Sequence, residues 1–270
     1  MKEKKGSFMF VKGLLYIVYK ILYNPKVEGR ENVIEEGPVV YCGNHVHILD
    51  QCSIIFPTKR MIHYMAKKEY FDGPFSWFFK ACGCISVDRS IHDGDAKKKA
   101  LEVLNNNQAL GIFPEGTRNM IHCKEDRTKE LYKHYEDKYT LKEFKKILKK
   151  NFARVSQIDF MKELVESKKI TEKEFIDNCM DPNSFLKKLV KKKKIKENEY
   201  YDTLFLPLKY GAVSFAQKTD AYIVPFVTRG TYKMFSKDFV IAIGKPFKVG
   251  KMTLEQANNK LRKELIDLIK

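Results

Sequence analysis

The chain has 270 residues, of which 44% are hydrophobic and 13% aromatic, and its formal net charge is +17 at pH 7. This composition supplies enough apolar side chains for a packed core and excludes an intrinsically disordered chain. The excess of positive charge favours an anionic partner, such as lipid headgroups, an acidic protein or nucleic acid.

The first predicted element is a helix over residues 8–23. Its apolar stretch is interrupted by two lysines and a glycine, and it is shorter than the about 20 apolar residues that a spanning helix needs. No cleavage site of a signal peptide follows it. We interpret residues 1–24 as a membrane-interfacial helix, because the lysine-rich start suits an anionic lipid surface. A helix that packs on the core is the alternative.

After this helix the pattern changes to short apolar runs that alternate with helical segments. We predict strands at residues 38–42, 61–65, 84–87, 109–113, 221–227 and 239–243, and helices at 96–105 and 253–269. This alternation predicts an α/β fold whose mixed, largely parallel central sheet is flanked by helices. Pro225 interrupts one of the runs, which favours an edge or a wall over a central position in the ladder.

Residues 121–203 differ from the rest, because they are rich in lysine, glutamate and aromatic residues and have a helical period. Residues 160–177 align with residues 185–202 at an offset of 25, and a repeat of this size predicts stacked helix–turn–helix units. Its lysine runs are typical of a solvated face, with lipid phosphates or nucleic acid as alternative contacts. The predicted organisation has four parts: an interfacial helix at 1–24, a domain in two pieces at 25–120 and 204–270, and a helical insertion at 121–203.

The six cysteines include no CxxC pair, and several of them lie within apolar runs, as Cys42 and Cys82 do. A reduced thiol in such a run behaves as a small hydrophobic side chain. We therefore expect a reducing compartment, no disulfide framework and no metal site.

A histidine and an aspartate follow the first predicted strand, at His45 and Asp50. A histidine exchanges a proton near neutral pH, and a carboxylate on its other ring nitrogen fixes the tautomer. Because five helical positions would turn the two side chains roughly 140° apart, we expect His45 in a turn and Asp50 inside the following helix. The spacing alone is common, and by itself it favours a structural histidine.

Two further polar blocks end predicted strands, where ligands gather in open α/β sheets. The block Gly-Cys-Ile-Ser-Val-Asp-Arg ends at Arg89, which can hold a phosphate or form a surface ion pair with the preceding aspartate. The block Phe-Pro-Glu-Gly-Thr-Arg is more specific. Its Gly116 lets backbone amides approach an anion, and its Arg118 can bind a phosphate bidentately. Glu115 can orient the arginine or the acceptor.

Four clusters in this order resemble the glycerolipid (lysophospholipid) acyltransferase family, typified by bacterial 1-acyl-glycerol-3-phosphate acyltransferases. They are Asn-His-x4-Asp at 44–50, the two polar blocks above, and Val-Pro at residues 224–225. The resemblance covers roughly residues 25–120 and 204–250, and it includes Ala-Lys-Lys-Glu at 66–69 and Pro-Leu-Lys-Tyr-Gly-Ala at 207–212. The insertion at 121–203 is not part of the common pattern, and it follows the phosphate-binding block directly. Because the insertion can cover or reshape the site, it affects which acceptor lipid the protein uses.

The resemblance implies an acyltransferase in which His45 is the general base and Asp50 its partner. It implies acceptor-binding residues at Lys67, Arg89, Glu115, Gly116, Thr117 and Arg118. The implied reaction moves an acyl group from acyl-CoA or acyl carrier protein to the sn-2 hydroxyl of lysophosphatidic acid, giving phosphatidic acid. It needs no metal or other cofactor, and the protein is expected on the cytoplasmic side of the cell membrane, as a peripheral or monotopic protein.

Two alternatives stay open. The acceptor can be another lysophospholipid, glycerol-3-phosphate or an amino-acid lipid, and acylation of a panel of acceptors separates these. A non-catalytic basic protein that binds lipid or nucleic acid is the alternative of another class. Such a binder has no need of His45, Asp50 and Glu115 beside a glycine and an arginine, so no nucleic-acid partner is expected.

Overall fold

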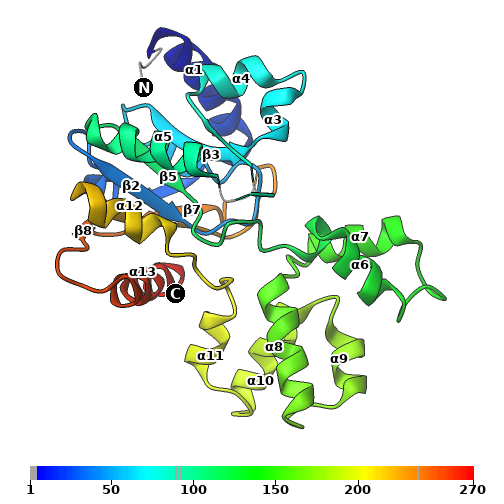
Figure 1. Cartoon of the computed structure of the whole chain (residues 1–270). Helices are drawn as coiled ribbons and strands as arrows, with labels where there is room; N and C mark the ends of the chain where they lie inside the picture. Colours follow the sequence, from blue (N-terminus) through cyan, green and yellow to red (C-terminus); the bar gives the residue numbers. More distant parts are fainter. Residues whose placement is uncertain (1–4, 89, 92, 236) are drawn as a thin grey trace. The chain divides into compact units, whose positions relative to one another are not determined.

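The structure is a computed structural model that describes residues 5–88, 90–91, 93–235 and 237–270. The chain forms two compact units (Figure 1). The first unit runs up to Gly116 and resumes at Leu208, and the second is the intervening segment Thr117–Pro207. The second unit thus begins and ends a few residues outside the expected limits of 121 and 203.

The first unit contains one sheet, which has eight strands in the described part of the chain. These are β1 (Lys26–Glu28), β2 (Val39–Gly43), β3 (Ile62–Lys67), β4 (Ile85–Val87), β5 (Ala109–Ile112), β6 (Tyr222–Arg229), β7 (Val240–Ile243) and β8 (Phe247–Lys248). Their order is β1-β7-β6-β2-β5-β3-β4, and β8 pairs with β6. The strands from β6 to β4 are parallel neighbours, whereas β7 and β8 run antiparallel to β6. The predicted mixed, largely parallel sheet is confirmed.

Helices flank this sheet, as the alternation predicted. They are α1 (Lys5–Tyr23), η1 (Arg30–Asn32), α2 (Cys52–Ile55), α3 (Glu69–Asp72), α4 (Ser76–Ala81), α5 (Gly94–Asn105), α12 (Gly211–Thr219) and α13 (Leu254–Ile269). Three of them, α5, α12 and α13, contact the sheet and cover one face, and α12 also contacts the other two (Figure 1). On β2, Val39 and Tyr41 pack in a buried cluster with Tyr19 of α1 and Ile54 of α2. Because alternate strand residues point to opposite faces, α1 and α2 cover the other face.

Pro225 lies inside the sheet, so the expectation of an edge or a wall was wrong. β6 pairs with β2 along one side and with β7 and β8 along the other. The register leaves a gap between β7 and β8 around Pro225, whose carbonyl accepts a hydrogen bond from the Gly244 amide at 2.8 Å. A proline is tolerated here because the ladder is interrupted on the side that its missing N–H would face.

Helix α1 packs one side on the first unit and exposes many apolar side chains on the other. Phe8 and Tyr19 are buried, and the Lys12 ammonium donates to the Thr58 carbonyl. Burial lowers the pKa of Lys12. The exposed apolar side chains of α1 are Met9, Phe10, Leu14, Leu15, Tyr16, Ile17, Val18 and Ile21. Among the described residues, no helix has both the length and the apolar character to cross a bilayer.

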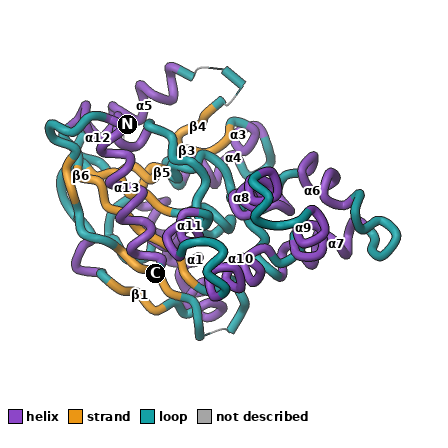
Figure 2. Tube along the Cα trace, turned by 90° about the horizontal axis from the view of Figure 1, so that it is seen from below, coloured by secondary structure: helices purple, strands orange, loops and turns teal. Residues whose placement is uncertain are grey.

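The second unit is built from helices and the loops that join them (Figure 2). Its described elements are η2 (Ile121–Cys123), α6 (Glu125–Tyr132), α7 (Leu141–Lys150), α8 (Val155–Glu166), α9 (Glu172–Asn178), α10 (Pro182–Lys191) and α11 (Glu197–Asp202). The sequence repeat corresponds to two helix pairs, α8–α9 and α10–α11. In both pairs the turn passes through a lysine with φ of 57°, at Lys168 and at Lys193, which are 25 residues apart. Equivalent residues, Ile170 and Ile195, are buried below the two turns.

Candidate active site

The candidate site lies where three neighbouring strands end. Because β2, β5 and β6 are parallel, their carboxyl ends meet at one edge of the sheet. His45 follows β2, Glu115 follows β5, and Tyr232 follows β6. This edge is where ligands bind in open α/β sheets.

Asn44 fixes the start of the turn that carries His45. Its side-chain amide donates to the Thr228 carbonyl at 3.2 Å, and its side-chain oxygen accepts from the Thr228 amide at 2.9 Å. Both side chains are buried, so these hydrogen bonds form out of contact with solvent. The end of β2 is thereby held against β6.

The carboxylate of Asp50 is fully buried and organises this turn. Its Oδ2 faces the His45 ring at 2.9 Å from Nδ1, and it also accepts the backbone amides of Val46 and His47, each at 2.7 Å. Asp50 precedes α2, which begins at Cys52, so the expectation that Asp50 lies inside the helix was wrong. The chain turns back on itself because one carboxylate oxygen accepts hydrogen bonds from two successive backbone amides and from the His45 ring.

The His45 ring is held by a stack as well as by a hydrogen bond. It lies parallel to the Phe113 ring, with a centroid distance of 4.1 Å and an interplanar angle of 10°. With the Nδ1 proton directed at Asp50, the tautomer places the lone pair on Nε2. The side chain is 19% exposed, so part of the ring is open to solvent.

Glu115 connects the ends of β5 and β2. Its Oε1 accepts the backbone amide of His45 at 2.8 Å, and its side chain is buried. The following Gly116 closes a turn in which its amide donates to the Phe113 carbonyl at 2.9 Å. Gly116 has φ of 70°, a left-handed conformation that favours glycine.

Lys209 is a cation that the sequence analysis did not assign to the site. A Cβ on Gly116 would lie 2.8 Å from Cε of Lys209, so the lysine side chain runs alongside the glycine. The Lys209 amide also donates to the Pro114 carbonyl at 2.9 Å. Lysine at this place in the Pro-Leu-Lys-Tyr-Gly-Ala block was the available signal, and the structure shows that the block meets the turn of Glu115 and Gly116.

Tyr232 is the second site residue that the sequence analysis missed. Its hydroxyl donates to Oδ1 of Asp50 at 2.8 Å. Burial and the neighbouring Asp50 charge raise the pKa of Tyr232 well above its usual value, so the phenol keeps its proton. Its position three residues after β6 was the available signal, because β6 ends at the same edge as β2.

Four further residues were predicted to bind the acceptor, namely Lys67, Arg89, Thr117 and Arg118. Lys67 ends β3 with its side chain 46% exposed, and its ammonium lies 3.9 Å from Glu69. Arg89 lies outside the described residues. Thr117 and Arg118 belong to the second unit, where the Thr117 hydroxyl accepts a hydrogen bond from Lys124. The structure therefore brings together His45, Asp50, Glu115 and Gly116 within the first unit.

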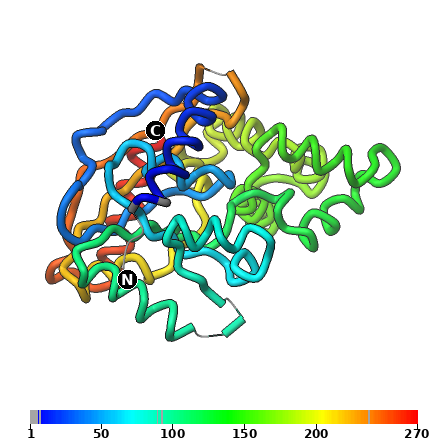
Figure 3. Tube along the Cα trace, turned by 90° about the horizontal axis from the view of Figure 1, so that it is seen from above, coloured from blue at the N-terminus to red at the C-terminus, as the bar shows by residue number. Residues whose placement is uncertain are grey.

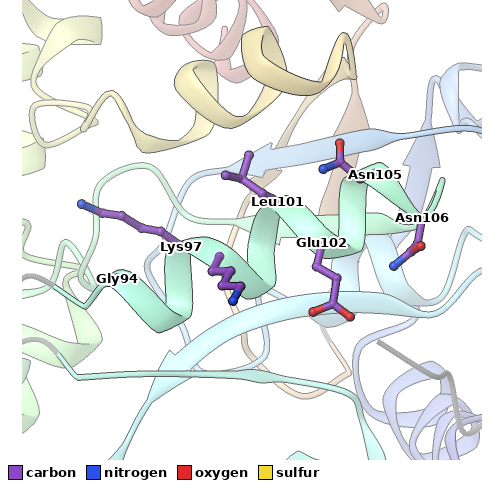
Figure 4. A pocket seen from close by; sticks show the side chains of 7 residues that line it. Gly94, Lys97, Leu101, Glu102, Asn105 and Asn106 are labelled. Carbon is purple, nitrogen blue, oxygen red and sulfur yellow. The ribbon is translucent and has the colours of Figure 1, made fainter.

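A separate groove of about 530 Å³ runs along α5 (Figure 4). Its lining comes from one side of that helix, from Gly94 to Asn106, and includes Lys97, Lys98 and Glu102. The turn that holds His45 contributes no residue to it. We assign the chemistry to the edge of the sheet and not to this groove.

The fold and the site define an α/β protein with a histidine–carboxylate pair at the carboxyl edge of its sheet. A family model described as Acyltransferase matches residues 24–229, which is more than half of the chain. The chain therefore belongs to the Acyltransferase family, and the predicted family is confirmed.

Two proteins that are similar in sequence carry the name of a specific acyltransferase. The chain is 34% identical over 96 residues to the 1-acyl-sn-glycerol-3-phosphate acyltransferase of Borreliella burgdorferi, which covers 34% of this chain and 38% of that protein. It is 30% identical over 115 residues to the protein of the same name from Bacillus subtilis, which covers 41% of this chain and 57% of that protein. The matches thus span less than two thirds of these relatives.

A solved structure shares the fold. The 1-acyl-sn-glycerophosphate (LPA) acyltransferase PlsC from Thermotoga maritima superposes with a TM-score of 0.57 at 15% sequence identity. The alignment covers 99% of this chain and 81% of that chain. At this identity the similarity shows the α/β fold alone.

Proposed function

We propose that the protein transfers a fatty acyl group from acyl-CoA or acyl carrier protein to the sn-2 hydroxyl of 1-acyl-glycerol-3-phosphate, giving phosphatidic acid. The observation that carries the proposal is the His45–Asp50 pair, whose ring and carboxylate lie 2.9 Å apart at the carboxyl edge of the sheet. The names of the relatives from Borreliella burgdorferi and Bacillus subtilis support the choice of acceptor.

His45 is the proposed general base. Nε2 of His45 takes the proton from the acceptor hydroxyl. At the same time the hydroxyl oxygen attacks the thioester carbonyl carbon and forms the new C–O bond. The tetrahedral intermediate then collapses, the C–S bond breaks, and the proton on Nε2 passes to the departing thiolate. Asp50 stabilises the imidazolium that forms between these two steps. A general base of this kind contributes roughly 10²- to 10⁴-fold to the rate.

The acceptor phosphate needs cations near the ring. Lys209 supplies one beside Gly116, and Lys67 ends the parallel strand β3 at the same edge of the sheet. Arg89 and Arg118 remain proposed contacts on the strength of the family resemblance. Such cations hold the acceptor with its hydroxyl oriented towards the base. This orientation raises the rate of acyl transfer.

The acceptor is a membrane lipid, and α1 is the proposed site of membrane attachment. One side of the helix exposes apolar residues, among them Phe10, Leu14 and Ile17, while the chain as a whole carries a net charge of +17. An apolar helix side with surrounding positive charge suits an anionic bilayer surface. We place the protein peripherally on the cytoplasmic side of the cell membrane.

The proposal is tested by measuring lipid products by mass spectrometry with lysophosphatidic acid and either acyl-CoA or acyl carrier protein as donor. Other lysophospholipids and glycerol-3-phosphate serve as competing acceptors in the same mixture. We expect phosphatidic acid as the main product, and a loss of at least about 100-fold in His45→Ala. His134→Ala, at an exposed histidine of the second unit, is the matched control. Turnover of His45→Ala near that of the wild type would refute the base assignment.

A further inference from the structure

The loop between β6 and β7 spans residues 230–239, of which all but residue 236 are described, and its two ends lie close together. It begins at Gly230, whose φ is 81° and where a Cβ would lie 2.0 Å from the Asp238 carbonyl oxygen. Only glycine permits this approach of two backbone segments. The Thr231 hydroxyl also lies 3.2 Å from the Asp238 carboxylate and donates to it. The two ends of this β6–β7 loop are therefore fixed to each other.

Within the loop, Tyr232 completes the hydrogen bonding of the Asp50 carboxylate. Oδ2 of Asp50 accepts from the His45 ring, and Oδ1 accepts from the Tyr232 hydroxyl at 2.8 Å. A carboxylate bound through both oxygens cannot rotate about its Cβ–Cγ bond without breaking one of these contacts. The phenol thus holds the plane in which Asp50 faces the histidine.

The ring of Tyr232 is itself held from three directions. It stacks on His47 with a centroid distance of 4.1 Å, and it contacts Phe239 at 4.4 Å. Its third neighbour is Tyr23 in the last turn of α1, at 5.7 Å and an interplanar angle of 76°. The direction of the hydroxyl therefore depends in part on where α1 ends.

A backbone hydrogen bond ties the same loop to α1. The Phe235 amide donates to the Leu22 carbonyl at 2.7 Å, and Figure 3 shows the loop beside the end of that helix. Leu22 is among the last four carbonyls of the helix, which lack partners within it. Phe235 has φ of 61°, a strained conformation for a residue with a side chain. Its contact with Leu22 contributes to holding that conformation.

We propose that Tyr232 is a positioning residue for the His45–Asp50 pair and that it links the position of α1 to the rate of acyl transfer. The link runs from the Tyr23 ring to the Tyr232 ring and from the Tyr232 hydroxyl to the Asp50 carboxylate. The inference rests on the proposed function for its kinetic readout and on the geometry alone for its spectroscopic one.

Tyr232→Phe is the direct test, because it removes the hydroxyl and keeps the ring contacts. We expect kcat to fall roughly 10-fold, because the Asp50 carboxylate loses a hydrogen bond made to a charged group. The KM for lysophosphatidic acid should stay unchanged, since Tyr232 acts through Asp50. Tyr222→Phe, in an exposed tyrosine at the start of β6, is the control and should keep the wild-type kcat.

The link to α1 is tested by Tyr23→Leu, which removes a ring neighbour of Tyr232 and leaves the hydrogen bond in place. We expect a smaller fall in kcat than in Tyr232→Phe. The double variant should fall no further than Tyr232→Phe alone, because both changes act through one contact with Asp50. Losses that multiply in the double variant would exclude the link.

Proton NMR of the substrate-free protein gives a readout that does not depend on turnover. The resonance of the His45 Nδ1 proton, assigned by its absence in His45→Ala, should shift in Tyr232→Phe and stay in place in Tyr222→Phe. An unshifted resonance, or a wild-type kcat in Tyr232→Phe, would overturn the positioning role. If Tyr232→Phe shifts the resonance but the wild-type protein forms no phosphatidic acid, the proposed function alone is contradicted.

Discussion

The residues around Asp50 show how one buried carboxylate serves both structure and chemistry. Oδ2 accepts the amides of Val46 and His47, which shapes the turn, and the same atom faces the His45 ring. The turn would lose its shape without these two hydrogen bonds, and the ring would lose its orientation. The local fold and the proposed activity therefore depend on the same side chain.

Asp50→Asn separates these two tasks. An asparagine oxygen in the place of Oδ2 can still accept the two backbone amides and the Nδ1 proton, but the side chain carries no charge with which to stabilise the imidazolium. We expect a folded protein with a kcat lower by about 10³- to 10⁴-fold, because the neutral amide no longer stabilises the imidazolium. Thermal unfolding followed by circular dichroism checks the fold. Activity within a few-fold of the wild type would contradict the role of Asp50.

Lys209→Ala tests the cation beside Gly116. A charge-assisted hydrogen bond to a phosphate contributes about 1.5–3 kcal/mol, so its loss should raise the KM for lysophosphatidic acid by about 10-fold or more. Lys218→Ala, at an exposed lysine in the last turn of α12, should leave the KM unchanged. Equal kinetics of the two variants would remove Lys209 from the phosphate site.

At the scale of elements, α1 has a surface that water does not favour. Its exposed side chains include Phe10, Leu14 and Ile21, whereas Phe8 and Tyr19 attach it to the first unit. Transfer of such side chains from water into the boundary of a bilayer is favourable by about 1.5–3 kcal/mol each. The helix therefore has a physical reason to lie on a lipid surface.

Ile17→Asp measures this contribution. Ile17 is 59% exposed on α1, and a charge there should weaken binding to anionic vesicles by at least about 10-fold in a cosedimentation assay. The control is Ile91→Asp, at a residue that is 66% exposed between β4 and α5. Vesicle binding that is equally reduced in both variants would show that α1 has no special role.

The repeat in the second unit offers a prediction about its two turns. Lys168 and Lys193 both have φ of 57°, which is unfavourable by about 1–2 kcal/mol for a residue with a Cβ. Glycine relieves this strain at some cost in chain entropy, so Lys168→Gly and Lys193→Gly should each stabilise the fold by up to about 1 kcal/mol. Lys187→Gly inside α10 should destabilise it by about 1 kcal/mol. Denaturant unfolding measures all three, and stability lowered in both turn variants would refute the argument.

For the whole molecule, charge sets the range of the proposed interaction with membranes. The net charge of +17 attracts an anionic surface, and salt screens that attraction, with a Debye length of about 10 Å at 0.1 M and 3 Å at 1 M. We expect binding to phosphatidylglycerol vesicles to fall strongly between these concentrations, while binding to phosphatidylcholine vesicles stays weak and nearly constant. If binding to both kinds of vesicle is independent of salt, the net charge makes no contribution and only the apolar side chains of α1 are involved.

The pattern of the sequence was sufficient for the sheet. Both faces of the central strands are covered, so β2 and β5 are continuous apolar runs, and the residues from Val39 to Gly43 are all buried. The polar blocks that follow these strands also pointed to their carboxyl ends. The short strands β1 and β8, of three and two residues, gave no such pattern and were missed.

The sequence by itself determined the family, the strand and helix pattern, the helical repeat and the pairing of His45 with Asp50. Each of these produces a local periodicity or a contiguous motif that can be recognised in the sequence. Only the tertiary structure decided that Glu115 holds the His45 amide, that Lys209 lies beside Gly116 and that Tyr232 reaches Asp50 across 182 residues. The physical reason is that strand order and register bring distant residues together, and no local pattern encodes which strands become neighbours.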